Sequence, residues 1–184
     1  HKLYGPKGTG ALFIRKGAPL EPMIYGGGQE HNLRASTENI AGIGAFGMAA
    51  ELATISLEEN IEHIIRLETH FIGQLDEQNI DYKINGTERV PGVFNLTLFN
   101  IDGQNLVMQL DMNGISISFG AACASGTAKA TSTLLDIGLT EKEALSSVRI
   151  SFGKIHTLEN VQTVTKAISR IINQNAGKEM TYAG

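Results

Sequence analysis

Residues 81–119, DYKINGTERVPGVFNLTLFNIDGQNLVMQLDMNGISISF, contain the alternation that decides the fold. Short runs rich in β-branched and aromatic residues predict strands over 81–84, 93–99 and 115–119. Between the last two runs, apolar residues recur at helical spacing and predict a helix over 104–113. Strands that alternate with helices are typical of an α/β layer domain, in which helices cover one or both faces of a small sheet.

The flanking sequence continues this pattern. Upstream, Ser56 and Glu59 fit a capping box, so a helix is predicted over 57–77. Downstream, the pattern predicts a helix over 141–146, a strand over 148–151 and a closing helix over 158–173 with Thr157 as its N-cap. We therefore expect residues 57–184 to form a small α/β domain.

The first 56 residues differ in composition from the rest. A short buried strand is predicted over 11–15, and the loop after it contains three successive glycines at 26–28, which require unusual backbone angles or close approach of another group. From Thr37 onward, apolar and small residues at helical spacing predict a tightly packed, buried helix. The domain boundary is predicted near residues 54–56.

Composition and charge limit the function classes. With 42% hydrophobic residues, 18% charged residues and a formal net charge of -4, the chain has no basic field for nucleic acid or anionic membranes. No apolar run approaches the roughly 18 residues of a membrane span, and no signal segment opens the chain, so a cytoplasmic location is expected. Because the chain begins at His1 without an initiator methionine, we expect it to be a fragment.

Two residues are candidates for covalent chemistry. Lys2 stands beside glycines that let the backbone approach a planar group, and a partly desolvated amine can form a Schiff base; an exposed turn lysine is the alternative. Cys123, the single cysteine, follows small residues that leave a thiol accessible, with Lys129 nearby. A buried, inert cysteine is the alternative there. The residues alone leave both pairs of interpretations open.

Other residues are candidates for binding. Arg149 alternates with apolar neighbours on its strand and can clamp a carboxylate through two parallel hydrogen bonds, unless it is simply solvated. Ser36 and Thr37 can offer hydroxyls to a phosphate at a helix start, unless they are ordinary caps. The five histidines are scattered without the spacing of metal ligands, so no metal site is expected.

Together these segments resemble the C-terminal half of the NifS/IscS-type cysteine desulfurases. These enzymes belong to the class-V aminotransferase family and have fold type I of the pyridoxal-phosphate (PLP) enzymes. The resemblance spans nearly the whole chain. It is carried by HKLYGPKGTG at 1–10, GGGQE at 26–30, LRASTEN at 33–39, FNL at 94–96, ACASG at 122–126 and SVRIS at 147–151.

The resemblance implies an α/β fold in two parts and a cofactor. Residues 1–56 would be the C-terminal remnant of the PLP-binding large domain, and residues 57–184 the small domain with the active-cysteine loop. The cofactor would be pyridoxal 5'-phosphate, held covalently by Lys2 in the His1–Lys2 motif. Thr37 would contact the cofactor phosphate of the neighbouring subunit in a homodimer.

The resemblance also implies the reaction. Asn95 and Arg149 would hold L-cysteine, and the Cys123 thiolate would attack the substrate sulfur to give L-alanine and a persulfide on Cys123. A sulfur-acceptor protein would take the persulfide sulfur for iron–sulfur cluster assembly or for tRNA or cofactor thiolation.

Two departures from the family pattern bear on these expectations. Ser36 stands where the family commonly has glycine, and residues 128–131, AKAT, replace a Leu-Glu-Pro-Ser stretch. The family's ring stacked on the cofactor, its pyridinium-pairing aspartate and most phosphate contacts come from an upstream half, so the fragment alone is expected to be inactive. Another class-V enzyme, such as an aminotransferase or selenocysteine lyase, and a non-catalytic sulfur-carrier fragment are the alternatives.

Overall fold

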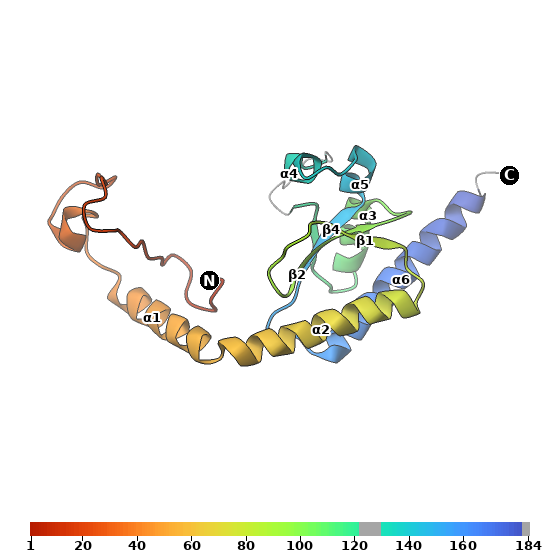
Figure 1. Cartoon of the computed structure of the whole chain (residues 1–184), viewed down its shortest axis with the longest axis horizontal. Coiled ribbons are helices and arrows are strands. Elements are labelled where there is room, and N and C mark those ends of the chain that lie inside the picture. The colour runs from red at the N-terminus through yellow and green to blue at the C-terminus, as the bar shows by residue number, and fades with distance from the viewer. Residues whose placement is uncertain (122–129, 182–184) are drawn as a thin grey trace. The chain divides into compact units, whose positions relative to one another are not determined.

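The structure is a computed structural model that describes the backbone of residues 1–121 and 130–181 (Figure 1). The chain divides into two compact units, His1–Glu58 and Glu59–Gly184. Each unit is described on its own.

The second unit is built on a four-stranded sheet in the order β1-β2-β4-β3, and every neighbouring pair of strands is antiparallel. Two central strands carry most of the pairing, because β2 and β4 match over five residues, whereas β3 contributes only Ser118–Phe119. The strands are β1 (Tyr82–Ile84), β2 (Val93–Leu98), β3 (Ser118–Phe119) and β4 (Ser147–Ser151).

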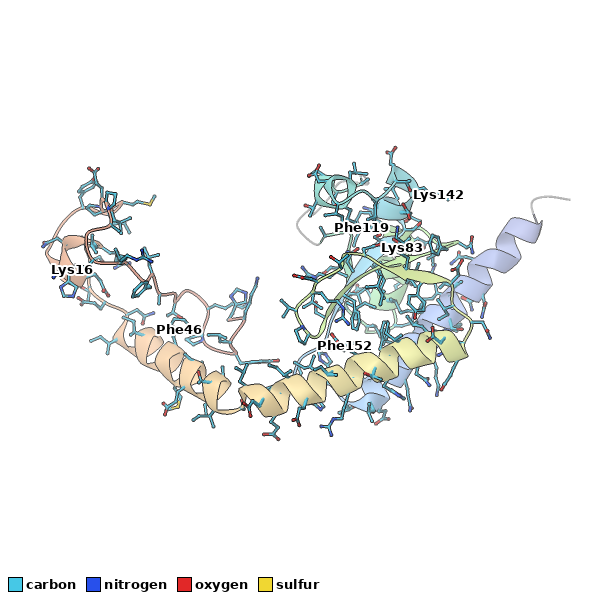
Figure 2. All side chains as sticks on the ribbon, in the orientation of Figure 1. Lys16, Phe46, Lys83, Phe119, Lys142 and Phe152 are labelled. Atoms are coloured by element: carbon cyan, nitrogen blue, oxygen red, sulfur yellow. The ribbon has the colours of Figure 1, made fainter. Side chains whose placement is uncertain are left out.

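Three helices cover one face of this sheet: α2 (Leu57–Glu77), α3 (Gly103–Asp111) and α6 (Leu158–Thr181). Alternate residues of β2, Phe94, Leu96 and Leu98, point into the core that these helices share, since successive strand residues face opposite sides. Phe152 stacks edge-on against Phe71 of α2 and Phe94 of β2, at centroid distances of 5.6 and 6.1 Å (Figure 2). On the opposite face of the sheet, most side chains of the two central strands are polar: Asn95, Thr97, Ser147, Arg149 and Ser151.

Two short helices, α4 (Ser132–Asp136) and α5 (Glu141–Leu145), form a separate small cluster around Leu134, Leu139 and Ala144. Thr140 caps α5 in a reciprocal capping box with Glu143. The sequence predicted α5, which begins with a capping box, and missed α4, which is equally short and has no side-chain cap hydrogen bond.

The first unit contains a short 3-10 helix, η1 (Gln29–Asn32), and the helix α1 (Ile40–Ile55). The strand predicted over residues 11–15 is wrong: this segment has no regular structure, and Phe13 is 90% exposed. A strand needs a neighbouring strand to satisfy its backbone groups, and none pairs with this segment in the described part of the chain.

The helix predicted from Thr37 begins three residues later, because the Asn39 side chain, 3.1 Å from the Gly42 amide, supplies the N-cap. The prediction that it is buried is also wrong, since no residue of α1 is buried and Ile40 is 77% exposed. Small and apolar residues at helical spacing indicate only that the helix has surfaces able to pack; they do not indicate what covers those surfaces.

The helix predicted over 57–77 matches α2. The closing helix begins at Leu158 as predicted, with the Thr157 hydroxyl accepting from the Asn160 amide at 3.2 Å as its N-cap, but it ends at Thr181 and not at residue 173. No single helix among the described residues is long and apolar enough to cross a membrane; α1 and α2 meet that criterion of length and composition only as a bent pair.

Candidate functional site

The polar face of the sheet brings together two of the predicted binding residues. In the strand register Asn95 of β2 lies directly opposite Arg149 of β4, and Arg149 lies opposite Ser118 of β3. Residues directly opposite in antiparallel strands point to the same face. The predicted substrate-binding pair is therefore one cross-strand row with Ser118 at its end.

Arg149 has unused hydrogen-bonding capacity in this row. Its guanidinium is half-buried, and its Nε atom is buried with no hydrogen-bond partner in the part of the chain that the structure describes. A buried guanidinium N–H that lacks an acceptor is costly, and a carboxylate is the acceptor that fits its fork of donors. The row therefore offers a hydrogen-bond donor, Arg149 Nε, to an anionic ligand.

Asn95 is held at both atoms of its amide. Its Nδ2 donates to the Gly120 carbonyl at 2.8 Å, and its Oδ1 accepts from Asn85 Nδ2 at 2.7 Å. One hydrogen on Nδ2 remains for a ligand, since an amide nitrogen carries two. Asn95 can therefore contribute one donor beside Arg149.

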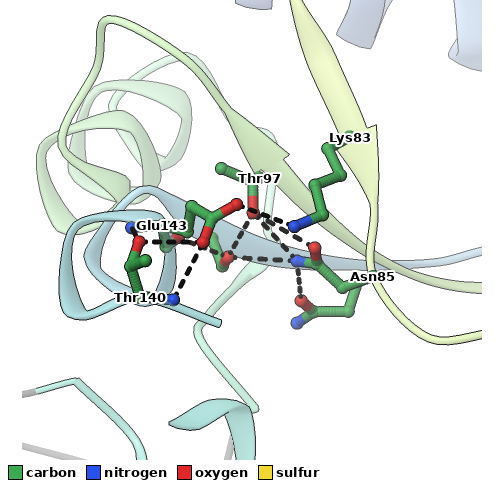
Figure 3. Close-up of polar contacts among 7 residues, drawn as sticks. Lys83, Asn85, Thr97, Thr140 and Glu143 are labelled. Atoms are coloured by element: carbon green, nitrogen blue, oxygen red, sulfur yellow. Dashed lines mark hydrogen bonds and ion pairs between the residues drawn. The ribbon is translucent and has the colours of Figure 1, made fainter. Parts of the chain in front are cut away.

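Asn95 is in contact with a buried polar network. Asn85 Nδ2 also lies 3.0 Å from Thr97 Oγ1 and 3.2 Å from Ser147 Oγ, and the Ser147 hydroxyl donates to the Glu143 carbonyl at 2.7 Å (Figure 3). Asn85, Thr97 and Ser147 are at most 7% exposed. Because a buried polar group without a partner is destabilising, such a network fixes its members in one arrangement.

An ion pair stands at the end of this network. The Lys83 Nζ lies 2.7 Å from Glu143 Oε1, while Glu143 Oε2 accepts from the backbone amide and the hydroxyl of Thr140, each at 2.8 Å (Figure 3). The hydrogen bond from Lys83, followed by those from Thr140, lowers the pKa of Glu143 to about 2. Glu143 is therefore an anion over the physiological range.

The strand β3 leads toward the predicted nucleophile. Gly120 follows β3 with a φ of 55°, and a Cβ placed on it would come 3.1 Å from the Thr131 side chain, so glycine suits this turn. Cys123 and Lys129 lie in residues 122–129, outside the described residues. The described part of the site ends at Gly120 and Ala121.

The predicted cofactor residues lie in the first unit. His1, Lys2 and Thr37 are all exposed, and Thr37 precedes the Asn39 cap rather than standing at the helix start itself. Ser36 has a φ of 87°, so the backbone adopts there the left-handed conformation that glycine would favour, although a serine occupies the position.

These residues fit the chemistry of pyridoxal phosphate in kind. A primary amine at Lys2 suits the aldehyde of the cofactor, and the Thr37 hydroxyl suits its phosphate. Both side chains are exposed, so this unit by itself gives the amine and the hydroxyl no enclosed, desolvated setting. No group of three or more His, Cys, Asp or Glu residues that could hold a metal ion occurs among the described residues.

Several residues of the site escaped the sequence analysis. Asn85, Thr97, Ser147 and Glu143 were not singled out, although Thr97 and Ser147 alternate with apolar core residues on their strands. That alternation was the available signal, because a polar residue between two core residues must face the other side of the sheet. Asn85 gave no such signal, because an Asn-Gly pair at 85–86 is also typical of a turn.

Comparison with known proteins decides the family. The model of the family described as aminotransferase class-V matches residues 1–164. The chain belongs to this family. Members of this family and the cysteine desulfurases among them are enzymes that use pyridoxal phosphate.

Within the class-V family the chain is similar to cysteine desulfurases. It is 41% identical over 178 residues to the cysteine desulfurase IscS of Clostridium botulinum strain Hall, covering 95% of this chain and 45% of that protein. A solved NifS-like protein matches 94% of this chain and 44% of its own with a TM-score of 0.83 and 32% identity. A structure of SspA in complex with cysteine matches 85% of this chain and 43% of its own, with a TM-score of 0.60 and 27% identity.

The chain thus spans about 45% of the length of the curated relatives it matches. The class-V match and these similarities bear out the resemblance inferred from the motifs.

Proposed function

We propose that the protein containing this chain is a cysteine desulfurase, which transfers sulfur from L-cysteine to its own cysteine with pyridoxal phosphate as cofactor. The observation that carries the proposal is the Asn95–Arg149–Ser118 row, in which a buried guanidinium nitrogen lacks an acceptor among the described residues. The similarity to cysteine desulfurases supports it.

Arg149 would bind the carboxylate of the substrate. A guanidinium forms two parallel hydrogen bonds to a carboxylate, which fixes the orientation of an amino acid as well as its position. The remaining hydrogen of Asn95 Nδ2 would add a third donor on the same sheet face. The solved relative in complex with cysteine supports L-cysteine as the amino acid.

Lys2 and Thr37 would hold the cofactor, with His1 beside the lysine. Pyridoxal phosphate supplies an electron sink at the substrate's α-carbon when bound. Lys2 Nζ would take and return protons at that carbon as a general base and acid. In a homodimer, Thr37 would donate its hydroxyl hydrogen to the cofactor phosphate of the neighbouring subunit.

Cys123 would be the nucleophile. Its thiolate sulfur forms a bond to the substrate sulfur, the bond from that sulfur to the substrate carbon breaks, and the electron pair stays with the carbon, which is protonated to give alanine. A persulfide remains on Cys123. A sulfur-acceptor protein in the cytoplasm would then take the outer sulfur by attack of its own thiol.

A turnover assay tests this function. Incubated with L-cysteine, pyridoxal phosphate and a thiol reductant, the full-length protein is expected to release alanine and sulfide in equal amounts. Cys123→Ala removes the only nucleophilic thiol in this chain and should lower both by about a hundredfold or more. Ser132→Ala, an exposed change on α4, is the matched control and should leave both rates unchanged.

Retention of cysteine turnover by Cys123→Ala, with release of pyruvate or transfer of the amino group, would identify a different class-V reaction. The 184-residue chain alone is expected to show negligible turnover, because Lys2 and Thr37 are exposed in it. Turnover by this chain at the rate of the full-length protein would contradict the expectation that residues outside the 184-residue chain are needed to hold the cofactor.

A further inference from the structure

The amide of Asn95 has one orientation, and the orientation is set from outside Asn95. Its nitrogen faces the Gly120 carbonyl, which can only accept. If the amide turned by half a rotation, Oδ1 would face that carbonyl and two acceptors would meet. The Oδ1 must then point at Asn85, which meets it with Nδ2.

The other end of the network is fixed in the same way. The Ser147 hydroxyl gives its single hydrogen to the Glu143 carbonyl at 2.7 Å. The Thr97 hydroxyl lies 3.0 Å from Ser147 Oγ and 3.2 Å from Asn85 Oδ1, and its single hydrogen goes to one of these two acceptors. The backbone carbonyls of Gly120 and Glu143 thus fix the directions of the hydrogen bonds that Asn95 and Ser147 donate.

Asn85 is the member that joins the two halves. Its Nδ2 lies within 3.2 Å of three acceptors, on Asn95, Thr97 and Ser147, and its own backbone amide donates to the Asn95 carbonyl at 2.9 Å. Asn85 is 7% exposed and lies beside Asn95 across from β2, next to the Asn95 end of the row. Its contacts with the row among the described residues are those with Asn95.

We propose that Asn85 is a positioning residue that holds the Asn95 amide so that its nitrogen faces both the Gly120 carbonyl and the ligand side of the row. The proposal rests on the proposed function only for its effect on L-cysteine binding. Its structural content, that Asn85 controls the hydrogen bond between Asn95 and Gly120, concerns residues of this chain alone.

Two consequences follow from removing the Asn85 amide. The Asn95 Oδ1 loses its buried donor, so the Gly120 carbonyl is left alone to orient the Asn95 amide. The hydrogen bond from Asn95 to the Gly120 carbonyl is then weakened, although the hydrogen bonds of the Asn85 side chain go to other residues. A residue that only filled space in the core would have neither effect.

Carbonyl carbon chemical shifts of the 184-residue chain give the first readout. The Gly120 carbonyl resonance is expected to move upfield in Asn85→Ala and further in Asn95→Ala, and the double variant should match Asn95→Ala, because Asn85→Ala weakens the hydrogen bond that Asn95→Ala removes. Asn173→Ala, an exposed asparagine on α6, is the control and should leave it in place. An unchanged Gly120 shift in Asn85→Ala, or shifts that add in the double variant, would overturn the proposal.

Asn85→Asp keeps the shape of the side chain and serves if the alanine variant does not fold. Its ionised carboxylate has no hydrogen for Asn95 Oδ1, so the Gly120 resonance should move upfield at neutral pH as it does for alanine. A Gly120 resonance that stays in place in the folded aspartate variant would contradict the positioning role.

Kinetics of the full-length protein give the second readout. Asn85→Ala should raise KM for L-cysteine about fivefold, the effect of losing one hydrogen bond, with a smaller effect on kcat. The same rise should appear in Asn95→Ala and should not grow in the double variant. Because the resonance readout needs no turnover, a protein without desulfurase activity would refute the function while leaving the positioning role to be decided by Gly120.

Discussion

At the scale of single residues, Glu143 shows how one carboxylate serves two elements. One oxygen completes the capping box of α5 with Thr140, and the other binds Lys83 of β1. The Glu143 side chain is 21% exposed, whereas the Lys83 side chain is 47% exposed. The capping hydrogen bonds, which join groups close in sequence, need less ordering than the exposed ion pair.

The lowered pKa of Glu143 predicts a pH dependence of stability. The pKa of Glu143 is about 2 in the folded chain and near its ordinary value of 4.5 in the unfolded chain, so its contribution to stability is full above about pH 4.5 and is lost as the pH falls toward 2. Urea midpoints measured from pH 2 to 7 should therefore fall more steeply for the natural chain than for Glu143→Gln below pH 4.5. Parallel profiles for the two proteins would contradict this, and Glu141→Gln, an exposed change on the same helix, is the control.

The alternation of residues along a strand predicts which face of the sheet each side chain lies on, and the site residues were predictable to that extent. Arg149 was predicted to point away from Val148 and Ile150, and it does, because those two are buried in the core while Arg149 lies on the polar face. The role of Asn85 was not predictable, since it depends on contacts with residues of β2 and β4 that lie 10 or more residues away in the sequence. Periodicity carries no information about such pairings.

At the scale of elements, the segment between β1 and β2 is tied to α2 by Glu68. The Glu68 carboxylate is 7% exposed, lies 2.6 Å from Arg89 Nη1 and also accepts from the Gly92 amide. The Arg89 guanidinium lies 4.5 Å from the centre of the Phe94 ring, so it covers the edge of the core as well. This contact sets where β2 begins against the helix.

Replacing Glu68 should therefore be costly. Glu68→Ala leaves the Gly92 amide and Arg89 without their acceptor, and we expect a loss of about 2 kcal/mol in the free energy of unfolding. Urea denaturation of this variant beside Glu62→Ala, an exposed change on the same helix, measures the difference. Equal midpoints for the two variants would show that the buried carboxylate does not hold this segment.

The bounds and burial of a helix were predictable where its apolar residues form one stripe that packs against the core. The helix α2 has such a stripe, with Leu67, Phe71 and Leu75 buried, and its predicted bounds match. The helix α1 is apolar around much of its surface, so the pattern gave its existence but neither its first residue nor its burial. The failed strand at 11–15 has the composition of a strand but no neighbour to pair with among the described residues.

At the scale of the molecule, the two units differ in what they bury. The second unit has a core of 17 buried hydrophobic residues from α2, α3, α6 and the sheet, and their neighbours. In the first unit Ala35 is the one buried hydrophobic residue, while Leu12, Met23 and Tyr25 are each more than 70% exposed. Large exposed apolar surface of this kind marks a face that another chain segment or molecule covers.

This difference predicts unequal protection of backbone amides from hydrogen exchange. An isolated helix of 16 residues is only marginally stable in water, and α1 buries no residue that would add tertiary stability. Amides of α1 in the 184-residue chain should therefore exchange roughly a hundredfold or more faster than those of β2 and α6, whose opening requires loss of the core. Exchange followed by mass spectrometry at two protein concentrations measures this. Equal protection of α1 and β2 at both concentrations would show that α1 is stabilised within a single chain, whereas protection of α1 that rises with concentration would show that a second copy covers its apolar surface.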